Sequence, residues 1–275
     1  MNIWLTLNIV LWISLMIQLS VSLTPPSEVI VGAQFPMHKT AANIEDGGGR
    51  RRRAAFVLAV EHINNKNDGF YDDLLPDTTI NYAVYDSKRN EGEAVVNAFY
   101  MWSNAKAIVA IGPASSGPSK QSQQVFKLPH VNIPQVSYSA TSAQLSDASS
   151  NPKFMRTPPS DVYQAEIMVS TIKLQGWTKV CILGGLDSYS LAGANAVIEE
   201  ITKTEGLSIL KSVSFDAETI SVEPQMTQLR TAGCPVIILW SQSGDMKTII
   251  KEADKQGKIF TSNYHQVYKV FCVFS

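Results

Sequence analysis

Three short runs of apolar residues, none broken by a charged or strongly polar side chain, place the strongest limit on how this chain can fold. They are AIVAI at 107–111, VCIL at 180–183 and VIILW at 236–240. A strand that is apolar on both faces has to be covered on both faces, as the strands of parallel sheets are. A stretch with helical spacing follows each run, so the sequence predicts βαβ units and an α/β fold of doubly wound parallel sheets.

The same alternation begins at Glu28 and continues through most of the chain. Strands are expected at 28–35, 79–86, 107–111, 135–137, 154–156, 179–183, 207–215 and 236–240. Helices are expected at 51–65, 91–104, 116–127, 161–175, 189–205, 222–232 and 244–256. A stretch rich in Ser, Asn and Pro near 147–159 is typical of a crossing between two sheets. We therefore expect two lobes, 28–155 and 156–260, and an irregular tail at 261–275.

The N-terminus has the features of a secretory signal. Residues 3–23 are mostly apolar, and small residues (Ser20 and Ser22) precede a Pro-Pro pair. Residues 1–23 are therefore expected to be a signal peptide. The alternative is an uncleaved signal anchor, because the apolar stretch approaches the roughly 20 residues that span a bilayer. Either way, the rest of the chain is expected on the extracellular side of the cell membrane, or secreted if the protein ends at Ser275.

Charge and cysteine content exclude several classes of protein. The chain has 23 Lys and Arg residues against 24 Asp and Glu, a net charge of −1, which argues against nucleic-acid binding. Its three cysteines are too few and too scattered for a disulfide scaffold or a zinc site. Serine-hydrolase, metalloprotease and Cys-His signatures are absent. The expectation is a binding protein, not an enzyme, with neither a cofactor nor a metal.

Four loops lie where ligands bind in doubly wound sheets, at the points where strands end and helices begin. They are 112–117, 137–142, 158–161 and 184–189. Ser116 at a helix start and the hydroxyl-rich second loop suit an anion, although an ordinary cap or polar turn would look the same. Asp161 is either a helix cap or the counter-ion of a ligand ammonium. Tyr189 is either a half-buried aromatic residue or a ring that stacks on a ligand.

A glycine triplet followed by four arginines, at 47–53, has two interpretations. It lacks the Lys-Ser/Thr ending of a phosphate-binding P-loop and the G-x-G-x-x-G spacing. The simpler interpretation is a mobile loop before a solvated basic helix start. The other is that one arginine binds a ligand carboxylate through its two-pronged guanidinium group.

Taken together, these loops resemble a known family. The stretches IGPASSGPS, NIPQVSYSATSAQLSD, FMRTPPSDVYQAEIM and GWTKVCILGGLDSYS are similar in order and spacing to class C G-protein-coupled receptors, nearest the metabotropic glutamate receptor branch. The similarity is to their extracellular Venus-flytrap domain, a two-lobed fold of the type I periplasmic-binding-protein class. It runs from about Val29 to Leu239, and FVLAVEHINN resembles the family's first long helix.

The resemblance implies a clamp that closes on an α-amino acid. Ser116 and Thr141, with Ser139 and Ala140 of the same loop, would hold the α-carboxylate. Asp161 would accept the α-ammonium with help from Thr141, and Tyr189 would lie over the ligand. The family's arginine for an acidic side chain falls in the basic run. Counting back from Ile63-Asn64 places it at Arg52, with Arg53 as the alternative.

The chain departs from the family pattern at several places. Ser190 stands where a glycine usually follows the cleft tyrosine, and no cysteine precedes Cys181, which leaves a non-covalent homodimer through the first lobe as the expected assembly. The first lobe is expected to be incomplete, and a G protein would couple only through a membrane region outside this sequence. The alternatives are an amino-acid solute-binding protein, the ectodomain of a receptor guanylate cyclase and, more remotely, an α/β enzyme acting on a phosphorylated substrate.

Overall fold

The computed structural model describes residues 25–38, 45–216, 220–255 and 269–274, the last of these by their backbone only. The predicted signal peptide at 1–23 lies outside the described residues. The helices are α2 Gly47–Asn64, α3 Glu91–Ser103, α4 Ser116–Phe126, the 3₁₀ turn η1 Ala143–Ser146, α5 Asp161–Leu174, α6 Ser188–Lys203, α7 Glu223–Thr231 and α8 Ser243–Lys255. The strands are β1 Glu28–Phe35, β2 Thr79–Asp86, β3 Val109–Ile111, β4 Gln135–Ser137, β5 Phe154–Arg156, β6 Lys179–Gly185, β7 Ser208–Phe215, β8 Val236–Ser241 and β9 Lys269–Phe274.

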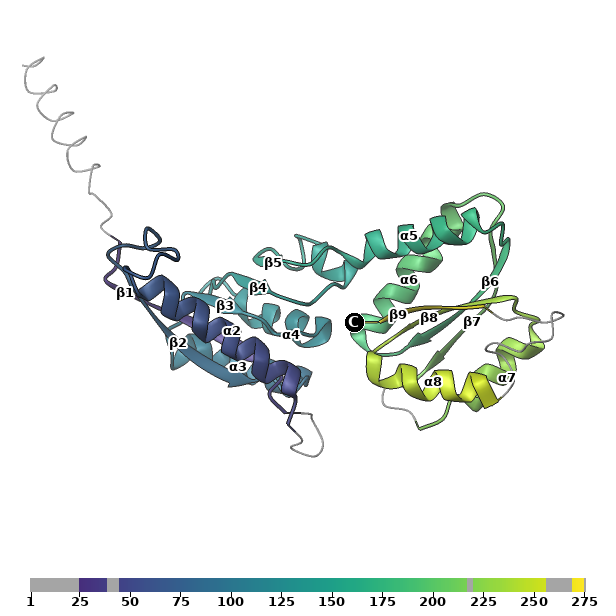
Figure 1. Ribbon diagram of the computed structural model, residues 1–275, viewed down its shortest axis with the longest axis horizontal. Coiled ribbons are helices and arrows are strands. Elements are labelled where there is room, and N and C mark those ends of the chain that lie inside the picture. The colour runs from purple at the N-terminus through teal and green to yellow at the C-terminus, as the bar shows by residue number, and fades with distance from the viewer. Residues whose placement is uncertain (1–24, 39–44, 217–219, 256–268, 275) are drawn as a thin grey trace, which may run out of the picture. The chain divides into compact units, whose positions relative to one another are not determined.

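These strands form two sheets, shown with their helices in Figure 1. The first has the order β2-β1-β3-β4-β5 and the second the order β7-β6-β8-β9. The pairs β1–β3, β3–β4, β4–β5, β6–β7, β6–β8 and β8–β9 are all parallel. The predicted α/β fold with parallel sheets is therefore confirmed.

The second sheet is covered on both faces, which explains its unbroken apolar runs. Val180 and Ile182 of β6 pack with α5 and α6 on one face, in a core that also contains Trp240. Cys181 and Leu183 point to the opposite face and pack with residues of α7 and α8. Because successive side chains of a strand alternate between faces, every position of such a strand has to be apolar.

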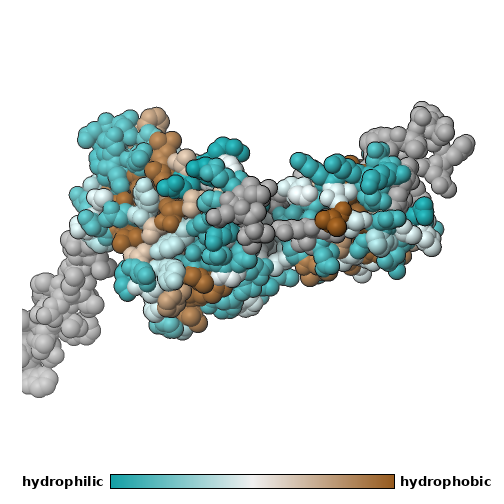
Figure 2. Space-filling view, turned by 90° about the horizontal axis from the view of Figure 1, so that it is seen from below, coloured by the Kyte–Doolittle hydropathy of each residue, from teal (hydrophilic) through white to brown (hydrophobic). Residues whose placement is uncertain are grey.

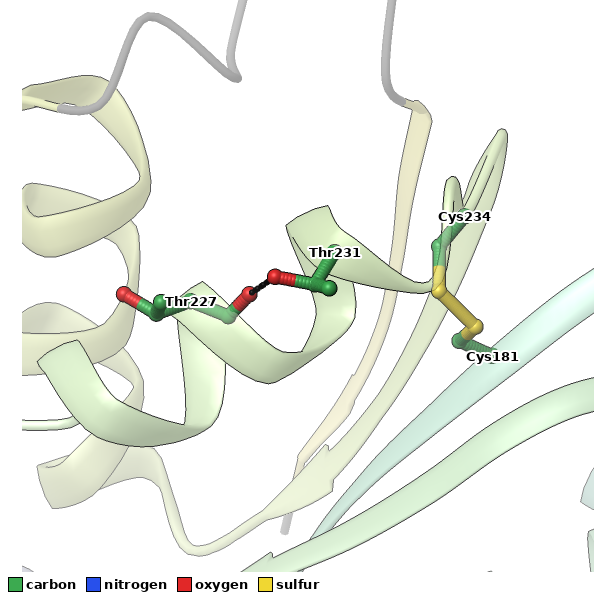
Figure 3. Close-up of a disulfide and its surroundings, with 4 residues drawn as sticks. All are labelled: Cys181, Thr227, Thr231 and Cys234. Atoms are coloured by element: carbon green, nitrogen blue, oxygen red, sulfur yellow. Dashed lines mark hydrogen bonds between the residues drawn. A yellow bond between two sulfur atoms is a disulfide. The ribbon is translucent and has the colours of Figure 1, made fainter.

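A disulfide joins the strand β6 to the segment that enters β8. Cys181 and Cys234 are bonded across 53 positions of sequence, with their Cα atoms 5.8 Å apart, beside helix α7 (Figure 3). Sequence reasoning did not predict this pair, because nothing in the spacing of the cysteines indicates that β6 and β8 are neighbours.

By its internal contacts the chain falls into two compact units, Met1–Val29 with Val57–Asn81 and Ile30–Phe56 with Tyr82–Ser275. In the smaller unit, the side-chain amide of Asn64 donates to the Ile80 carbonyl (2.9 Å) and accepts from the Ile80 N–H (2.8 Å). This pair fixes the end of α2 to the start of β2. The larger unit contains most of both sheets, and the lobe boundary expected near residue 155 remains a prediction.

Two expectations from the sequence are wrong. The tail at 261–275 is not irregular throughout, because Lys269–Phe274 forms β9, a run of β-branched and aromatic residues paired with β8. The glycine triplet is not a loop but the first turn of α2. There the Asp46 carboxylate accepts hydrogen bonds from the N–H groups of Gly48 (2.9 Å) and Gly49 (3.2 Å), which offsets the low helix propensity of glycine.

Within the described ranges, no helix combines the length and the apolarity that crossing a membrane would require.

Candidate ligand-binding site

The first predicted loop leads from β3 into α4. Gly112 has a φ of 83°, and a Cβ atom there would lie 2.4 Å from the Gln34 carbonyl oxygen, so this turn requires glycine. Ser116, the first residue of α4, is buried, and its hydroxyl oxygen accepts a hydrogen bond from the Ser142 N–H (3.2 Å). The start of α4 is thereby attached to the second predicted loop.

The second loop follows β4 and folds around the hydroxyl of Ser137. This oxygen accepts hydrogen bonds from the N–H groups of Ser139 (3.3 Å) and Ala140 (3.0 Å), and the hydroxyl donates to the Pro113 carbonyl (2.7 Å). Ala140 is buried, whereas Ser139 and Thr141 are half-buried. The amides of Ser139 and Ala140 are therefore already engaged within the loop, and the hydroxyl of Ser139 is its more available group.

Asp161 is the most unusual of the predicted residues. It begins α5 after the capping residue Ser160, and it is 2% exposed. Its backbone N–H donates to the Thr141 carbonyl (2.9 Å), and its carboxylate forms a hydrogen bond with the Thr141 side chain. Its Oδ2 atom is buried and has no hydrogen-bond partner among the residues that the structure describes. Burial raises the pKa of Asp161 to about 6, against the opposing effects of Thr141 and the Arg156 charge.

Tyr189 is 3% exposed, more deeply packed than the half-buried position that the sequence suggested. It lies in the first turn of α6 within the core of the second sheet, 6.2 Å from the Trp240 ring between centroids. Burial raises the pKa of its hydroxyl, and the nearby Asp161 carboxylate adds to the effect. Tyr189 and Asp161 are thus electrostatic neighbours.

Arg52 is exposed on α2, and its guanidinium carbon lies 6.0 Å from the centre of the Tyr138 ring, near the outer limit of a cation–π contact. Tyr138 in turn donates a hydrogen bond to the Gln34 carbonyl (3.1 Å) and stacks on Phe35. Since Tyr138 directly precedes Ser139, Arg52 lies beside the second loop.

The structure therefore brings most of the predicted residues together in pairs. Ser116 is joined to the second loop through Ser142, that loop is joined to Asp161 through Thr141, and Arg52 reaches its beginning through Tyr138. Among the described residues, no direct interaction joins Arg52 to Asp161 or Ser116 to Tyr189.

Sequence reasoning missed Arg156, at the end of β5. Its Nη1 donates to the Ser142 carbonyl (2.8 Å), its Nη2 donates to the Ser146 hydroxyl, and its charge acts on Asp161. Arg156 stands in the FMRTPP stretch immediately before the loop that leads to Asp161, but the sequence gives no sign that its side chain folds back onto η1. In the described part of the chain, no group of three or more His, Cys, Asp or Glu side chains is arranged to hold a metal ion.

Residues 51–265 match the family described as the receptor family ligand binding region. Because this match covers most of the chain, the protein belongs to that family.

Among curated proteins, the chain is similar to metabotropic glutamate receptor 4 of Mus musculus. The two are 25% identical over 257 residues, which cover 82% of this chain and 27% of that receptor. It is also similar to the same receptor of Rattus norvegicus, at 25% identity over 257 residues. Taste receptor type 1 member 1 of Homo sapiens is 26% identical over 251 residues, which cover 79% of this chain and 29% of that receptor. The resemblance to the ligand-binding region of class C receptors is confirmed, and the chain spans less than a third of the length of these relatives.

Proposed function

We propose that the chain is the extracellular ligand-binding region of an amino-acid-sensing class C receptor, and that it binds an α-amino acid through the residues gathered around the second loop. Membership of the receptor ligand-binding family and similarity to a glutamate receptor support this proposal. Glutamate is accordingly the first ligand to test.

The observation that carries the proposal is the buried carboxylate of Asp161 with its unpartnered Oδ2. A buried polar atom without a hydrogen bond is unfavourable, by about 1–3 kcal/mol for an unsatisfied group and by more for a charged one. A ligand ammonium would donate to Oδ2 and neutralise the charge. Thr141, bonded to the same carboxylate, would orient it.

The α-carboxylate of the ligand would be held on the other side of Thr141. Ser116 at the start of α4, the hydroxyl of Ser139 and the backbone N–H of Thr141 are the donors proposed for it, while Ala140 lines the loop. The start of a helix favours an anion, because its first N–H groups are unpaired and its dipole is positive there. The two charged ends of a zwitterion would thus be recognised by neighbouring segments.

Two residues would define the rest of the site. Arg52 would bind the acidic side chain of a glutamate-like ligand, since a guanidinium group matches a carboxylate with two parallel hydrogen bonds. Tyr189, close to Asp161, would contact the ligand near its ammonium group. The proposal is one of binding without catalysis, in line with the receptors to which the chain is similar.

The proposed partners follow from the same assignment. We propose a non-covalent homodimer, with coupling to a G protein only through a membrane region outside this sequence. Hydrophobic side chains (brown) reach the surface among hydrophilic ones in Figure 2. Helix α3 carries the exposed hydrophobic residues Val96, Phe99 and Tyr100, which are spaced to lie on one helix face. If this face packs against a second copy, Phe99→Glu should shift the chain from dimer to monomer in sedimentation equilibrium; an unchanged mass would contradict the dimer proposal at this face.

The test of the amino-acid site is calorimetric titration of the chain with L-glutamate. Asp161→Ala and Thr141→Ala should abolish measurable binding while the far-ultraviolet circular dichroism stays that of the wild type. Asp147→Ala is the matched control, because the Asp147 side chain is exposed and its hydrogen bonds within the described residues are to Ser149 and Ser150 of its own turn. Unchanged affinity in both the Asp161 and the Thr141 variants would refute the proposal.

A further inference from the structure

One carboxylate of the chain already lies at the start of α4, where the ligand's carboxylate is expected. Glu91, the first residue of α3, accepts a hydrogen bond at Oε1 from the Ser188 hydroxyl (2.9 Å). Its Oε2 accepts from the side-chain amide of Gln121 (3.2 Å). A single side chain on α3 therefore contacts residues of both α4 and α6.

The carboxylate rests directly against the first turn of α4. A Cβ atom built on Gly117 would lie 2.1 Å from Glu91 Oε1 and 3.2 Å from the Ser188 hydroxyl oxygen, so only glycine leaves room for Glu91 in this position. Ser115, which precedes α4, forms no side-chain capping hydrogen bond. Ser188 is itself the first residue of α6. The negative charge of Glu91 thus lies at the beginnings of two helices, where the helix dipoles favour an anion.

We propose that Glu91 is a specificity-determining residue, a tethered carboxylate that competes with the carboxylate of the ligand at the start of α4. This inference rests on the proposed function. A ligand anion that approaches Ser116 is repelled by the like charge of Glu91. The same charge has already partly compensated the dipole at the start of α4, so this helix end attracts the ligand anion less strongly. Affinity for an amino acid is then set partly by Glu91, and ligands without a charged α-carboxylate escape this competition.

Glu91→Gln separates the charge from the contacts. The glutamine oxygen can still accept from Ser188, and Gln121 can turn its amide to accept from the new NH₂ group, so the link between the helices is retained. Glu93→Gln is the matched control. Glu93 lies one half-turn further along α3, but its carboxylate pairs with Lys88 (2.9 Å) and not with α4 or α6.

The experiment measures the dissociation constants of L-glutamate and of its α-carboxamide analogue, L-isoglutamine, by calorimetry on the whole chain. Glu91→Gln is expected to tighten L-glutamate binding roughly two- to fivefold, the range of a carboxylate's interaction with a helix end. The same change should leave the affinity for L-isoglutamine unaltered, and Glu93→Gln should change neither. The gain should shrink as salt is raised, because charge repulsion is screened.

The outcomes distinguish this inference from the proposed function. If Glu91→Gln leaves the affinity for L-glutamate unchanged, or shifts the affinities for both probes equally, the inference is refuted while the amino-acid site stands. If the wild-type chain binds neither probe, the proposed function fails and this inference is refuted with it.

Discussion

The backbone N–H of Asp161 donates a hydrogen bond to the carbonyl oxygen of Thr141, with 2.9 Å between the two atoms. This bond ties the first turn of α5 to the loop that follows β4, although the two residues are 20 positions apart in the sequence. The buried carboxylate of Asp161 forms a hydrogen bond with the Thr141 side chain, and its Oδ2 has no partner within the described part of the chain. The ligand-free protein consequently retains a buried acidic group that is unfavourable when ionised, and this has measurable consequences.

Asp161→Asn should stabilise the ligand-free protein at neutral pH. Burial raises the pKa of Asp161 from its ordinary value of 3.8 to about 6, which corresponds to a loss of on the order of 1–3 kcal/mol in the free energy of unfolding at a pH above both values. An asparagine of the same size carries no charge to desolvate. Urea unfolding at pH 7.5 should show the gain, and a clearly lower stability of the variant would count against a buried ionised carboxylate.

The pH dependence follows from the same shift. Because the folded-state pKa is higher than the unfolded one, the native protein binds more protons than the unfolded chain between pH 4 and 6. The contribution of Asp161 to stability is therefore most favourable below about pH 4 and is lost as the pH rises through about 6. The stability difference between Asp161→Asn and the wild type should grow over this interval and level off above it; a constant difference would contradict the assignment.

Arg156→Gln should destabilise the loop and raise the pKa of Asp161 further. The substitution removes the charged donor to the Ser142 carbonyl and Ser146 hydroxyl, for an expected loss of about 1–3 kcal/mol. It also removes the positive charge that partly opposes the effect of burial on Asp161. Urea unfolding and an NMR titration of the Asp161 carboxyl would measure the two effects. Arg156→Lys keeps the charge, so it should restore the pKa of Asp161 more fully than it restores the hydrogen bonds to Ser142 and Ser146. An unshifted pKa of Asp161 in Arg156→Gln would refute the proposed electrostatic effect of Arg156.

Loss of the Cys181–Cys234 disulfide should lower the free energy of unfolding by about 2–5 kcal/mol, since the bond closes a loop of 53 residues in the unfolded chain. The double change Cys181→Ala and Cys234→Ala tests this in urea. A reducing agent should destabilise the wild type and leave the double variant unaffected. Equal sensitivity of both proteins to the reducing agent would contradict the prediction.

The first turn of α2 offers a matched pair of glycines. A Cβ atom on Gly49 would lie 1.8 Å from the Pro36 carbonyl oxygen, whereas on Gly47 its nearest neighbour would be an Arg51 nitrogen at 3.6 Å. Gly49→Ala should therefore lower the free energy of unfolding by about 1–3 kcal/mol, because the added Cβ atom would displace the backbone. Gly47→Ala should be neutral or stabilising by up to about 1 kcal/mol, because alanine favours the helix. Thermal unfolding of the two variants checks the prediction, and equal effects would refute the close contact at Gly49.

Much of the fold was predictable because the signals are local. The strands β1, β2, β4 and β5 have the expected bounds, since apolar runs and turn residues mark their ends. The strand β9 was missed because its run VFCVF follows a stretch without periodicity. The start of α2 was missed because glycine has low helix propensity; the Asp46 carboxylate that caps it is itself bound by Arg89, at 3.0 Å to Nε and 2.8 Å to Nη2.

The candidate site was predictable only as a set of loops. The rule that ligands bind where strands lead into helices identified the segments of Ser116, Thr141 and Asp161. It could not indicate how deeply each residue is buried, which is decided by packing across the sheet. For the same reason Arg156 and Glu91 were missed, since both act through contacts between segments that are distant in the sequence.

The most direct test of the account compares L-glutamate with glutarate, the same dicarboxylate without its ammonium group, by calorimetric titration of the wild-type chain at pH 7.5. If Asp161 accepts the ligand ammonium, L-glutamate should bind with one site per chain and glutarate at least about tenfold more weakly, as expected for the loss of one buried charge-assisted hydrogen bond. Equal affinity for the two compounds, or no binding of L-glutamate, would contradict the central claim.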